Sequence, residues 1–192
     1  MTRALIDFLQ LYRTIPKKDQ ALIENAFEHK SFKEGEFLTK PNRIVKHLFF
    51  ICHGVLRIRK TNEEGAVSIH FFLKENQFCT ILDSFNNEVI AEESIETASA
   101  AGVLGISKIR LLELYRAVPW LKSLIDEINQ QRLLEKIKTR NAYLGLDSTA
   151  RYRLFLNTQA DIALRVSLTD IASYLGITPQ SLSRIRKDLM GR

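Results

Sequence analysis

The chain has 192 residues, of which 45% are apolar and 26% are charged, and its formal net charge is +6. This length allows one large or two small domains with real cores, and the apolar fraction is ordinary for a globular protein. No stretch approaches the ~20 apolar residues that span a bilayer. Asp7, Gln10 and Arg13 also interrupt the first segment, which excludes a signal peptide. We therefore expect a cytoplasmic protein without a membrane partner.

The residue types that commonly bind metals or carry out catalysis show no familiar spacing in this sequence. Cys52 and Cys79 lie far apart, so buried thiols are favoured over a disulfide, and two thiols alone do not hold an iron–sulfur cluster. The histidines lack the His-x-His spacing of metal-binding barrels: His29, His47, His53 and His70. No Ser/His/Asp set, Cys/His set or Walker-type loop is present. We expect no enzyme activity, no metal and no cofactor, and metal in the purified protein would instead favour a cupin-type metalloenzyme.

The first two thirds of the chain change from a helical to a strand pattern. Short amphipathic helices are expected over residues 4–13 and 17–29, with Pro16 opening the second. From Phe32 to about Ile106, short apolar runs alternate with turns. The expected strands are 47–54, 55–61, 67–73 and 98–106, with Val67, Ile69, Phe71 and Leu73 on one face of the third. Regularly spaced short strands predict a barrel or β-roll rather than a parallel sheet.

A long helix is expected next, because no proline or glycine occurs between Pro119 and Tyr143. It would run roughly 40 Å, longer than a small roll covers along one side. A long helix with a narrow apolar row commonly pairs with a copy of itself, and the alternative is packing on its own domain. The row that we expect at the dimer interface consists of Leu121, Ile125, Ile128, Leu134 and Ile137. Gly145 ends the helix, a hinge is expected at 145–148, and Asp147–Ser148 can cap a helix over 149–157.

Residues 168–187 have the pattern of a helix-turn-helix. Ser167 or Thr169 can cap the first helix, and Gly176 suits a turn that needs positive φ. Thr178 can cap the second helix, with Pro179 at its first position. The apolar residues of the first helix, Leu168, Ile171, Ala172 and Leu175, share one face at helical spacing, and Ile177 fills the corner between the helices. The second helix is expected to bury Leu182, Ile185 and Leu189. Such a hairpin of helices can be merely structural, but the small Ala172, the glycine and a basic outward face favour DNA binding.

The charge distribution favours the same function. Residues 1–129 carry 17 Lys and Arg against 17 Asp and Glu, whereas residues 130–192 carry 11 against 5. The whole excess of +6 therefore lies in the C-terminal third, and a local surplus of cations attracts a polyanion. A uniformly basic solvated surface would not be so asymmetric, and no lipidation signal or basic amphipathic segment points to a membrane.

The order of these elements resembles the bacterial Crp/Fnr family of transcription regulators. The resemblance covers nearly the whole chain and rests on FKEGEFL at 32–38, HLFFICHGVLRIRK at 47–60, the long helix, and LTDIASYLGITPQSLSRIRKDL at 168–189. It implies an α+β protein: an N-terminal cyclic-nucleotide-binding-like β-roll with flanking helices, a long dimerisation helix and a C-terminal helix-turn-helix. The corresponding domains are 1–118, 119–145 and 146–192.

The sequence departs from this family at three places. Asn42 replaces a usual loop glycine, a mild change. Family members that bind cyclic AMP use an arginine for the phosphate and a glutamate for the ribose, but no arginine occurs between Asp83 and Ser107. Glu92, Glu93 and Glu96 lie there instead. Carboxylates repel a phosphodiester, so we expect no cyclic AMP binding by the usual mode, and this acidic cluster indicates solvated surface rather than a metal site. Most or all of the two-stranded wing after the helix-turn-helix is also expected to be missing.

The resemblance implies a homodimer that binds a palindromic operator in double-stranded DNA. Gln180, Ser181 and Arg184 match the family's base-reading positions. The residues expected to contact phosphates are Thr169, Thr178, Ser183, Arg186 and Lys187. RNA polymerase and an unidentified small-molecule effector are further candidate partners, and the effector's binding residues are unknown. The alternative function is a small-molecule sensor whose C-terminal segment makes protein contacts, which a salt-sensitive gel shift on genomic DNA would distinguish.

Overall fold

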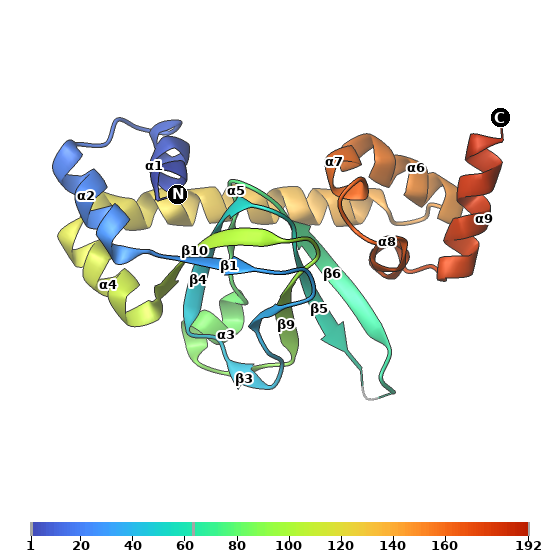
Figure 1. The fold of residues 1–192 in the computed structure, drawn as a ribbon, viewed down its shortest axis with the longest axis horizontal. Helices are drawn as coiled ribbons and strands as arrows, with labels where there is room; N and C mark the ends of the chain where they lie inside the picture. Colours follow the sequence, from blue (N-terminus) through green and yellow to red (C-terminus); the bar gives the residue numbers. More distant parts are fainter. Residues whose placement is uncertain (1, 63, 192) are drawn as a thin grey trace.

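The computed structural model describes residues 2–62 and 64–191. It shows an elongated molecule in which a long helix runs along a β-roll and joins helices at its two ends (Figure 1). The helices around the roll are α1 (Arg3–Gln10), α2 (Lys17–Ala26), α3 (Leu82–Asn87) and α4 (Lys108–Ala117). The long helix is α5 (Pro119–Ala142), and it is followed by α6 (Ser148–Thr158), α7 (Ala160–Ala163), α8 (Leu168–Leu175) and α9 (Pro179–Met190). We refer to α6–α9 as the C-terminal helical unit.

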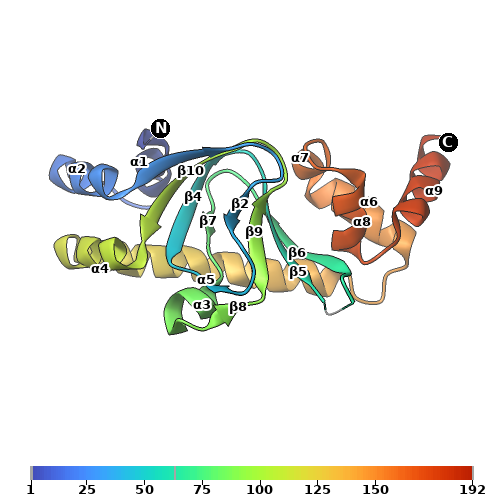
Figure 2. The same ribbon diagram turned by 60° about the horizontal axis from the view of Figure 1, so that its bottom comes forward.

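The roll is built from two antiparallel four-stranded sheets, which confirms the predicted fold class. Their strand orders are β1-β10-β4-β7 and β2-β9-β5-β6, and β3 pairs with β8 in a small ribbon. The strands are β1 (Glu28–Phe32), β2 (Phe37–Thr39), β3 (Arg43–Ile44), β4 (His47–His53), β5 (Leu56–Thr61), β6 (Val67–Leu73), β7 (Phe78–Cys79), β8 (Ile90–Ala91), β9 (Glu93–Thr97) and β10 (Ala101–Ser107). Figure 2 shows that α5 runs along one side of this roll.

The continuous apolar run in β4 is explained by two cores, one on each face of the strand. Phe49 and Ile51 point into the roll, whereas Leu48 and Phe50 pack on the other side against α1, α4 and the first half of α5. Because successive side chains of a strand alternate between faces, a strand covered on both sides has no polar face. No disulfide joins Cys52 to Cys79, and Cys79 is a buried thiol in the roll interior.

The expected start of the strand region was wrong by several residues. The second predicted helix, 17–29, ends at Ala26, because Phe27 is already extended with φ −95° and ψ 143°. Residues 28–32 then form β1, in which His29 lies opposite Leu104 of β10. The pattern Glu-His-Lys-Ser lacks apolar alternation, so the ladder with β10 rather than local propensity determines this strand.

Strand β6 also departs from the simple alternation predicted for it. Its register against β5 shifts so that Phe71 lies opposite Ile58 but Ile69 lies opposite Arg59, which leaves His70 as an extra residue. Such a bulge reverses the side to which the following residues point. Ile69 and Phe72 therefore share one face, toward the C-terminal helical unit, while Leu73 points into the roll.

The connection from α5 to the C-terminal helical unit follows the predicted signals. Gly145 has φ +75° shortly after α5 ends, and the Asp147 side chain accepts a hydrogen bond from the Ala150 N–H at 2.8 Å, which caps α6. The short α7 was not expected. Within the described ranges, 2–62 and 64–191, no helix combines the length and the apolar character needed to cross a membrane.

Candidate nucleic-acid interface

The two helices of the predicted helix-turn-helix are capped as their sequence indicates. The Ser167 hydroxyl, rather than that of Thr169, accepts a hydrogen bond from the Asp170 N–H at 3.1 Å and begins α8. Gly176 ends α8 in the left-handed region with φ +68°. The Thr178 hydroxyl accepts a hydrogen bond from the Ser181 N–H at 3.1 Å and begins α9. These caps satisfy backbone groups that a helix end leaves without partners, so they fix where each helix starts and ends.

A small core holds α8 and α9 against α6. Ala172 and Leu182 are fully buried and Ile185 is nearly so, together with Phe155 of α6. Ala172 has only a methyl group where the helices meet, which allows the close crossing that the sequence predicts. Leu189 packs partly against this core, so the inward face of α9 is the predicted one.

The residues predicted to bind DNA lie on the outer side of α8 and α9. Two of the eight, Ser181 and Arg186, are half-buried. The other six are exposed: Thr169, Thr178, Gln180, Ser183, Arg184 and Lys187. Gln180 and Arg184 are four residues apart on α9 and therefore share a face. Within the described part of the chain, no ion pair engages Arg184, Arg186 or Lys187. Their charge is available to an external anion.

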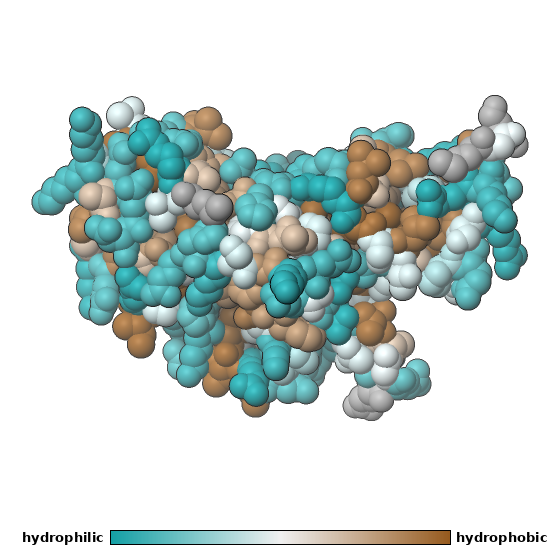
Figure 3. Space-filling view, in the orientation of Figure 1, coloured by the Kyte–Doolittle hydropathy of each residue, from teal (hydrophilic) through white to brown (hydrophobic). Residues whose placement is uncertain are grey.

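The position of α9 within the molecule leaves this face accessible. Figure 1 shows α9 at the extreme end of the molecule, beyond α6 and α8 and remote from the roll. In Figure 3 the surface over α9 is hydrophilic, whereas apolar side chains gather over α7 and α8, where the C-terminal helical unit approaches the roll. The unit therefore has a polar outer side and an apolar inner side.

The apolar inner side of the C-terminal helical unit packs on β6. Phe72 of β6 lies with its ring centroid 5.2 Å from that of Tyr174 and 6.4 Å from that of Phe155. Ile69 joins the same buried cluster. The Ser173 hydroxyl of α8 donates to the Val67 carbonyl at 2.9 Å and accepts from the Ile69 N–H at 3.1 Å. The helix-turn-helix is therefore fixed directly to an outer strand of the roll.

Arg57 joins the same two parts of the chain through charge. Its guanidinium contacts Glu96 of β9 at 2.7 Å and Asp170 of α8 at 2.5 Å. Arg59 also contacts Glu96, at 3.2 Å. The Glu96 side chain is only 3% exposed and the Arg57 side chain 14%, so this is a partly dehydrated group in which removing one charge leaves another uncompensated.

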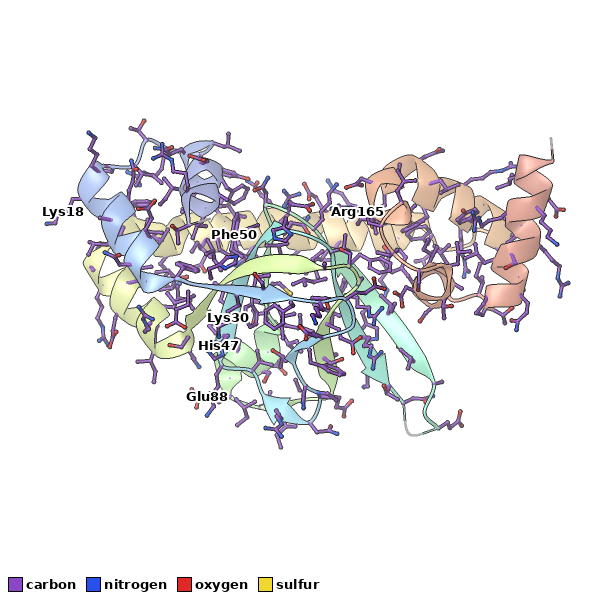
Figure 4. All side chains as sticks on the ribbon, viewed as in Figure 1. Lys18, Lys30, His47, Phe50, Glu88 and Arg165 are labelled. Atoms are coloured by element: carbon purple, nitrogen blue, oxygen red, sulfur yellow. The ribbon has the colours of Figure 1, made fainter. Side chains whose placement is uncertain are left out.

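A second pair of contacts lies at the other edge of this interface. Arg165, which follows α7, donates two hydrogen bonds to the Glu75 carboxylate, at 2.7 and 3.1 Å, and lies between the roll and the C-terminal helical unit (Figure 4). Lys74 binds Asp161 at 2.6 Å in a more exposed position. The forked geometry of Arg165 on a carboxylate adds directional specificity that a lysine pair lacks.

The Glu75 carboxylate makes this contact sensitive to acid. Burial by itself raises the pKa of Glu75, but hydrogen bonds from Arg165 and from the Gly54 N–H outweigh it and hold the pKa below its usual value. A carboxyl with a lowered pKa stabilises the folded state above its unfolded pKa and loses that contribution as pH falls through the folded pKa. The contact between the roll and the C-terminal helical unit therefore weakens in acid.

The predicted dimer row of α5 is divided between two environments. Leu121, Ile125 and Ile128 are at most 2% exposed and pack in the core of their own roll, so they are not available to a partner. Leu134 and Ile137 are 58% and 47% exposed. The exposed apolar residues of α5 are Leu133, Leu134 and Ile137. We revise the surface available for pairing to this set and call it the α5 seam.

Two of the three acidic residues predicted to repel a cyclic phosphate, Glu92 and Glu96, have ion-pair partners within the chain. Glu96 is held by Arg57 and Arg59, and Glu92 forms an ion pair with Lys60. The two arginines of β5, the strand that pairs with β9, are thus already engaged by a carboxylate. In the described residues, no group of three or more His, Cys, Asp and Glu side chains could hold a metal ion.

The residues that sequence reasoning missed are those that fix the C-terminal helical unit to the roll. Asp170 and Ser173 belong to the recognised helix-turn-helix, but their partners in β5 and β6 are more than 100 residues away in the chain. The available signal was weak: polar side chains on the side of α8 that does not face α9. A partner at that separation follows only from the folded topology.

Comparisons with known proteins agree with the observed architecture. The family model of the cyclic nucleotide-binding domain matches residues 29–117. The chain is 25% identical over 201 residues to the Lacticaseibacillus casei protein named "Probable transcriptional regulator flp", and the match covers 98% of this chain and 88% of that one.

Solved structures share the fold along most of the chain. FixK2 from Bradyrhizobium japonicum is similar with a TM-score of 0.73 and 16% identity, over 86% of this chain and 85% of that chain. A structure from Eubacterium rectale assigned to the Crp/Fnr family of transcriptional regulators is similar with a TM-score of 0.72 and 16% identity, over 96% and 89% of the two chains. The shared fold includes both the roll and the C-terminal helical unit.

The contact between Arg57 and Asp170 is expected to couple the two parts of the chain energetically. A double-mutant cycle with Arg57→Met and Asp170→Asn should give a coupling of about 1–2 kcal/mol in urea unfolding, because the pair is partly buried. The exposed pair Lys60–Glu92, treated in the same way, should show no measurable coupling. A coupling for Arg57 and Asp170 no larger than that of this control would contradict a role in holding the C-terminal helical unit.

Proposed function

We propose that this chain, which belongs to the Crp/Fnr family of transcription regulators, is a dimeric regulator that binds DNA sequence-specifically. The observation that carries this proposal is the capped helix α9, whose outward cations have no ion-pair partner in the described chain and which lies exposed at one end of the molecule. A helix of this kind fits the major groove of B-DNA. The domains in this proposal are 1–118, 119–145 and 146–192.

We assign the base contacts to Gln180, Ser181 and Arg184. Arginine can donate two hydrogen bonds to guanine O6 and N7, and glutamine can bind adenine N6 and N7. The phosphate contacts that position the helix without reading sequence are assigned to Thr169, Thr178, Ser183, Arg186 and Lys187. A regulator with these contacts acts in the cytoplasm, and RNA polymerase is the further partner to test at a bound promoter.

The α5 seam is the surface that we assign to the homodimer. Its leucines and isoleucine are apolar and about half exposed in the single chain, and burying the exposed half of each removes apolar surface from water at a gain of roughly 0.7–1.5 kcal/mol. Pairing along α5 would carry two C-terminal helical units on one side of the pair. Two α9 helices could then reach half-sites one helical turn apart, roughly 34 Å.

We propose that the roll does not bind cyclic AMP by the family's usual mode. The segment from Asp83 to Ser107 has no arginine, and its carboxylates would face the phosphate. Arg57 and Arg59 are held by Glu96, so releasing them for a phosphate would leave a nearly buried carboxylate without partners. The roll therefore senses a different ligand or serves only to position α5 and the C-terminal helical unit.

Substitutions in α9 are expected to separate base reading from phosphate contact. Arg184→Ala should weaken binding to a selected operator by about 1–3 kcal/mol and relax the preference at one base pair per half-site. Lys187→Ala should weaken binding to all DNA sequences alike, and it should reduce the magnitude of the slope of log K against log salt by about one. Fragments selected from the organism's own genome, followed by gel shifts at several salt concentrations, measure both.

Arg116→Ala, which removes an exposed arginine from α4 at the opposite end of the molecule, is the matched control for these measurements. It should change neither affinity nor sequence preference. An Arg184→Ala variant that behaves like this control would show that α9 is not the recognition helix.

Charges placed on the α5 seam are expected to separate the dimer. Leu134→Lys combined with Ile137→Lys should sediment as a monomer at micromolar concentration and lose binding to a palindrome, because two ammonium groups cannot be buried against an apolar partner. The control adds the same charge at Leu11 and Leu164, which are 78% and 88% exposed and lie outside α5. Sedimentation of the unaltered protein as a monomer would refute the assignment.

Cyclic nucleotides are expected to leave the roll unaffected. Losing a charge-assisted pair to the phosphate costs several kcal/mol, which moves a micromolar site into the millimolar range. Cyclic AMP and cyclic GMP at about 100 times a micromolar Kd should thus give neither binding heat in calorimetry nor a shift in Tm. Saturable micromolar binding of either nucleotide would instead show that an arginine outside the usual segment reaches the phosphate.

A further inference from the structure

A cavity of about 600 Å³ lies where β6, α5 and the C-terminal helical unit meet. This volume falls within the range of sites that hold drug-sized molecules, about 300–1,000 Å³. Among the described residues that line it, none comes from α3, β8 or β9. The cavity is therefore separate from the roll segment in which family members hold the phosphate of a cyclic nucleotide.

Aromatic side chains form much of the cavity wall. Phe71 and Phe72 come from β6, Tyr143 follows α5, and Tyr174 comes from α8. The two tyrosine rings meet edge to face, with centroids 6.0 Å apart. The Gln159 amide donates to Tyr174 at 3.2 Å and to Tyr143 at 3.4 Å, which holds both hydroxyls in place. Planar rings favour stacked or edge-to-face contacts with such a wall.

The charge of the cavity is predominantly positive. Lys136 of α5 points into it with its Nζ 4.7 Å from the centre of the Phe71 ring, and burial lowers the pKa of this ammonium. Arg140 lines the same wall. Glu135, the one carboxylate among the described lining residues, is already paired with Arg132 at 2.8 Å. A partly dehydrated ammonium without a carboxylate partner is costly, and an anionic ligand would reduce that cost.

Dimerisation through the α5 seam leaves the cavity open. Side chains three and four residues apart share a face of a helix, because each residue advances by about 100°. Lys136, Thr139 and Tyr143 therefore lie on one face of α5, toward the cavity. Leu134 and Ile137 lie on another face, so a second copy bound there does not occupy the same space.

We propose that this cavity binds a small organic anion with a planar aromatic body, the acidic group at Lys136 and the ring against Phe71, Tyr143 and Tyr174. Its regulatory meaning rests on the proposed function. A ligand in this cavity contacts the roll, α5 and α8 at once, so its binding energy depends on how the C-terminal helical unit is oriented. A ligand that prefers one orientation shifts the population toward it and thereby changes DNA affinity.

The test uses the full chain and two probes of the same shape, 2-naphthoate and the neutral 2-naphthamide, titrated by calorimetry and by the shift in Tm. The carboxylate should bind saturably and at least 10-fold more tightly than the amide. Lys136→Met should weaken naphthoate binding at least 10-fold. Lys138→Met removes a neighbouring exposed lysine of α5 that does not line the cavity, and it should bind naphthoate as the unaltered protein does.

Folding of the variant is checked by its Tm without ligand, which should not fall in Lys136→Met because a dehydrated charge is replaced by an apolar chain. Naphthoate should then change operator affinity in the unaltered protein but not in Lys136→Met. No saturable binding up to about 10 mM, equal affinity for the amide, or unchanged affinity in Lys136→Met would each overturn the proposal. Naphthoate binding that depends on Lys136 in a protein that binds no DNA would instead retain the cavity site and refute the proposed function.

Discussion

The position of the C-terminal helical unit depends on one strand, β6, being covered on both faces. The bulge at His70 places Ile69 and Phe72 on the outer side, while Leu73 stays in the roll interior. Burying two large apolar side chains against α6 and α8 contributes on the order of 3–6 kcal/mol. Without the bulge, one of the two side chains would point into the roll, and the burial free energy that holds the C-terminal helical unit to β6 would be about halved.

The charged groups around this apolar contact determine its geometry more than its strength. Arg57 lies between Glu96 of the roll and Asp170 of α8, and Arg165 donates two hydrogen bonds to the Glu75 carboxylate. Partly buried ion pairs gain little net free energy over apolar contacts, but a shift of the unit that broke them would leave charges dehydrated. The apolar cluster holds the unit to β6, and the ion pairs favour one orientation over its neighbours. A ligand in the adjacent cavity would act on an interface that already has a preferred arrangement.

The sequence predicted what is determined locally. The caps at Asp147 and Thr178, the left-handed turn at Gly176 and the main strands of the roll each depend on residues within a few positions of one another. The exposed face of α9 followed from the same helical spacing. The helix-turn-helix could therefore be recognised, together with its outward residues, before any tertiary contact was known.

Contacts between distant segments could not be predicted in this way. Strand β1 has no apolar alternation, and it forms because its backbone pairs with that of β10 in an antiparallel ladder. The outward direction of Phe72 depends on a bulge that arises from pairing with β5. The wall of the cavity combines residues from β6, α5 and α8 that are far apart in the sequence, so no motif marks it.

The long helix shows that a correct helical period does not by itself reveal which residues of an apolar row are buried. Ile128 and Leu134 belong to one row when steps of three residues are followed through Gln131, and a single seam was expected on that basis. Each step of three falls about 60° short of a full turn, so two such steps carry the row about 120° around the helix. One more step, to Ile137, brings it to the side opposite Ile128. The row therefore begins in the core of the roll, at Leu121, Ile125 and Ile128, and ends in solvent at Leu134 and Ile137.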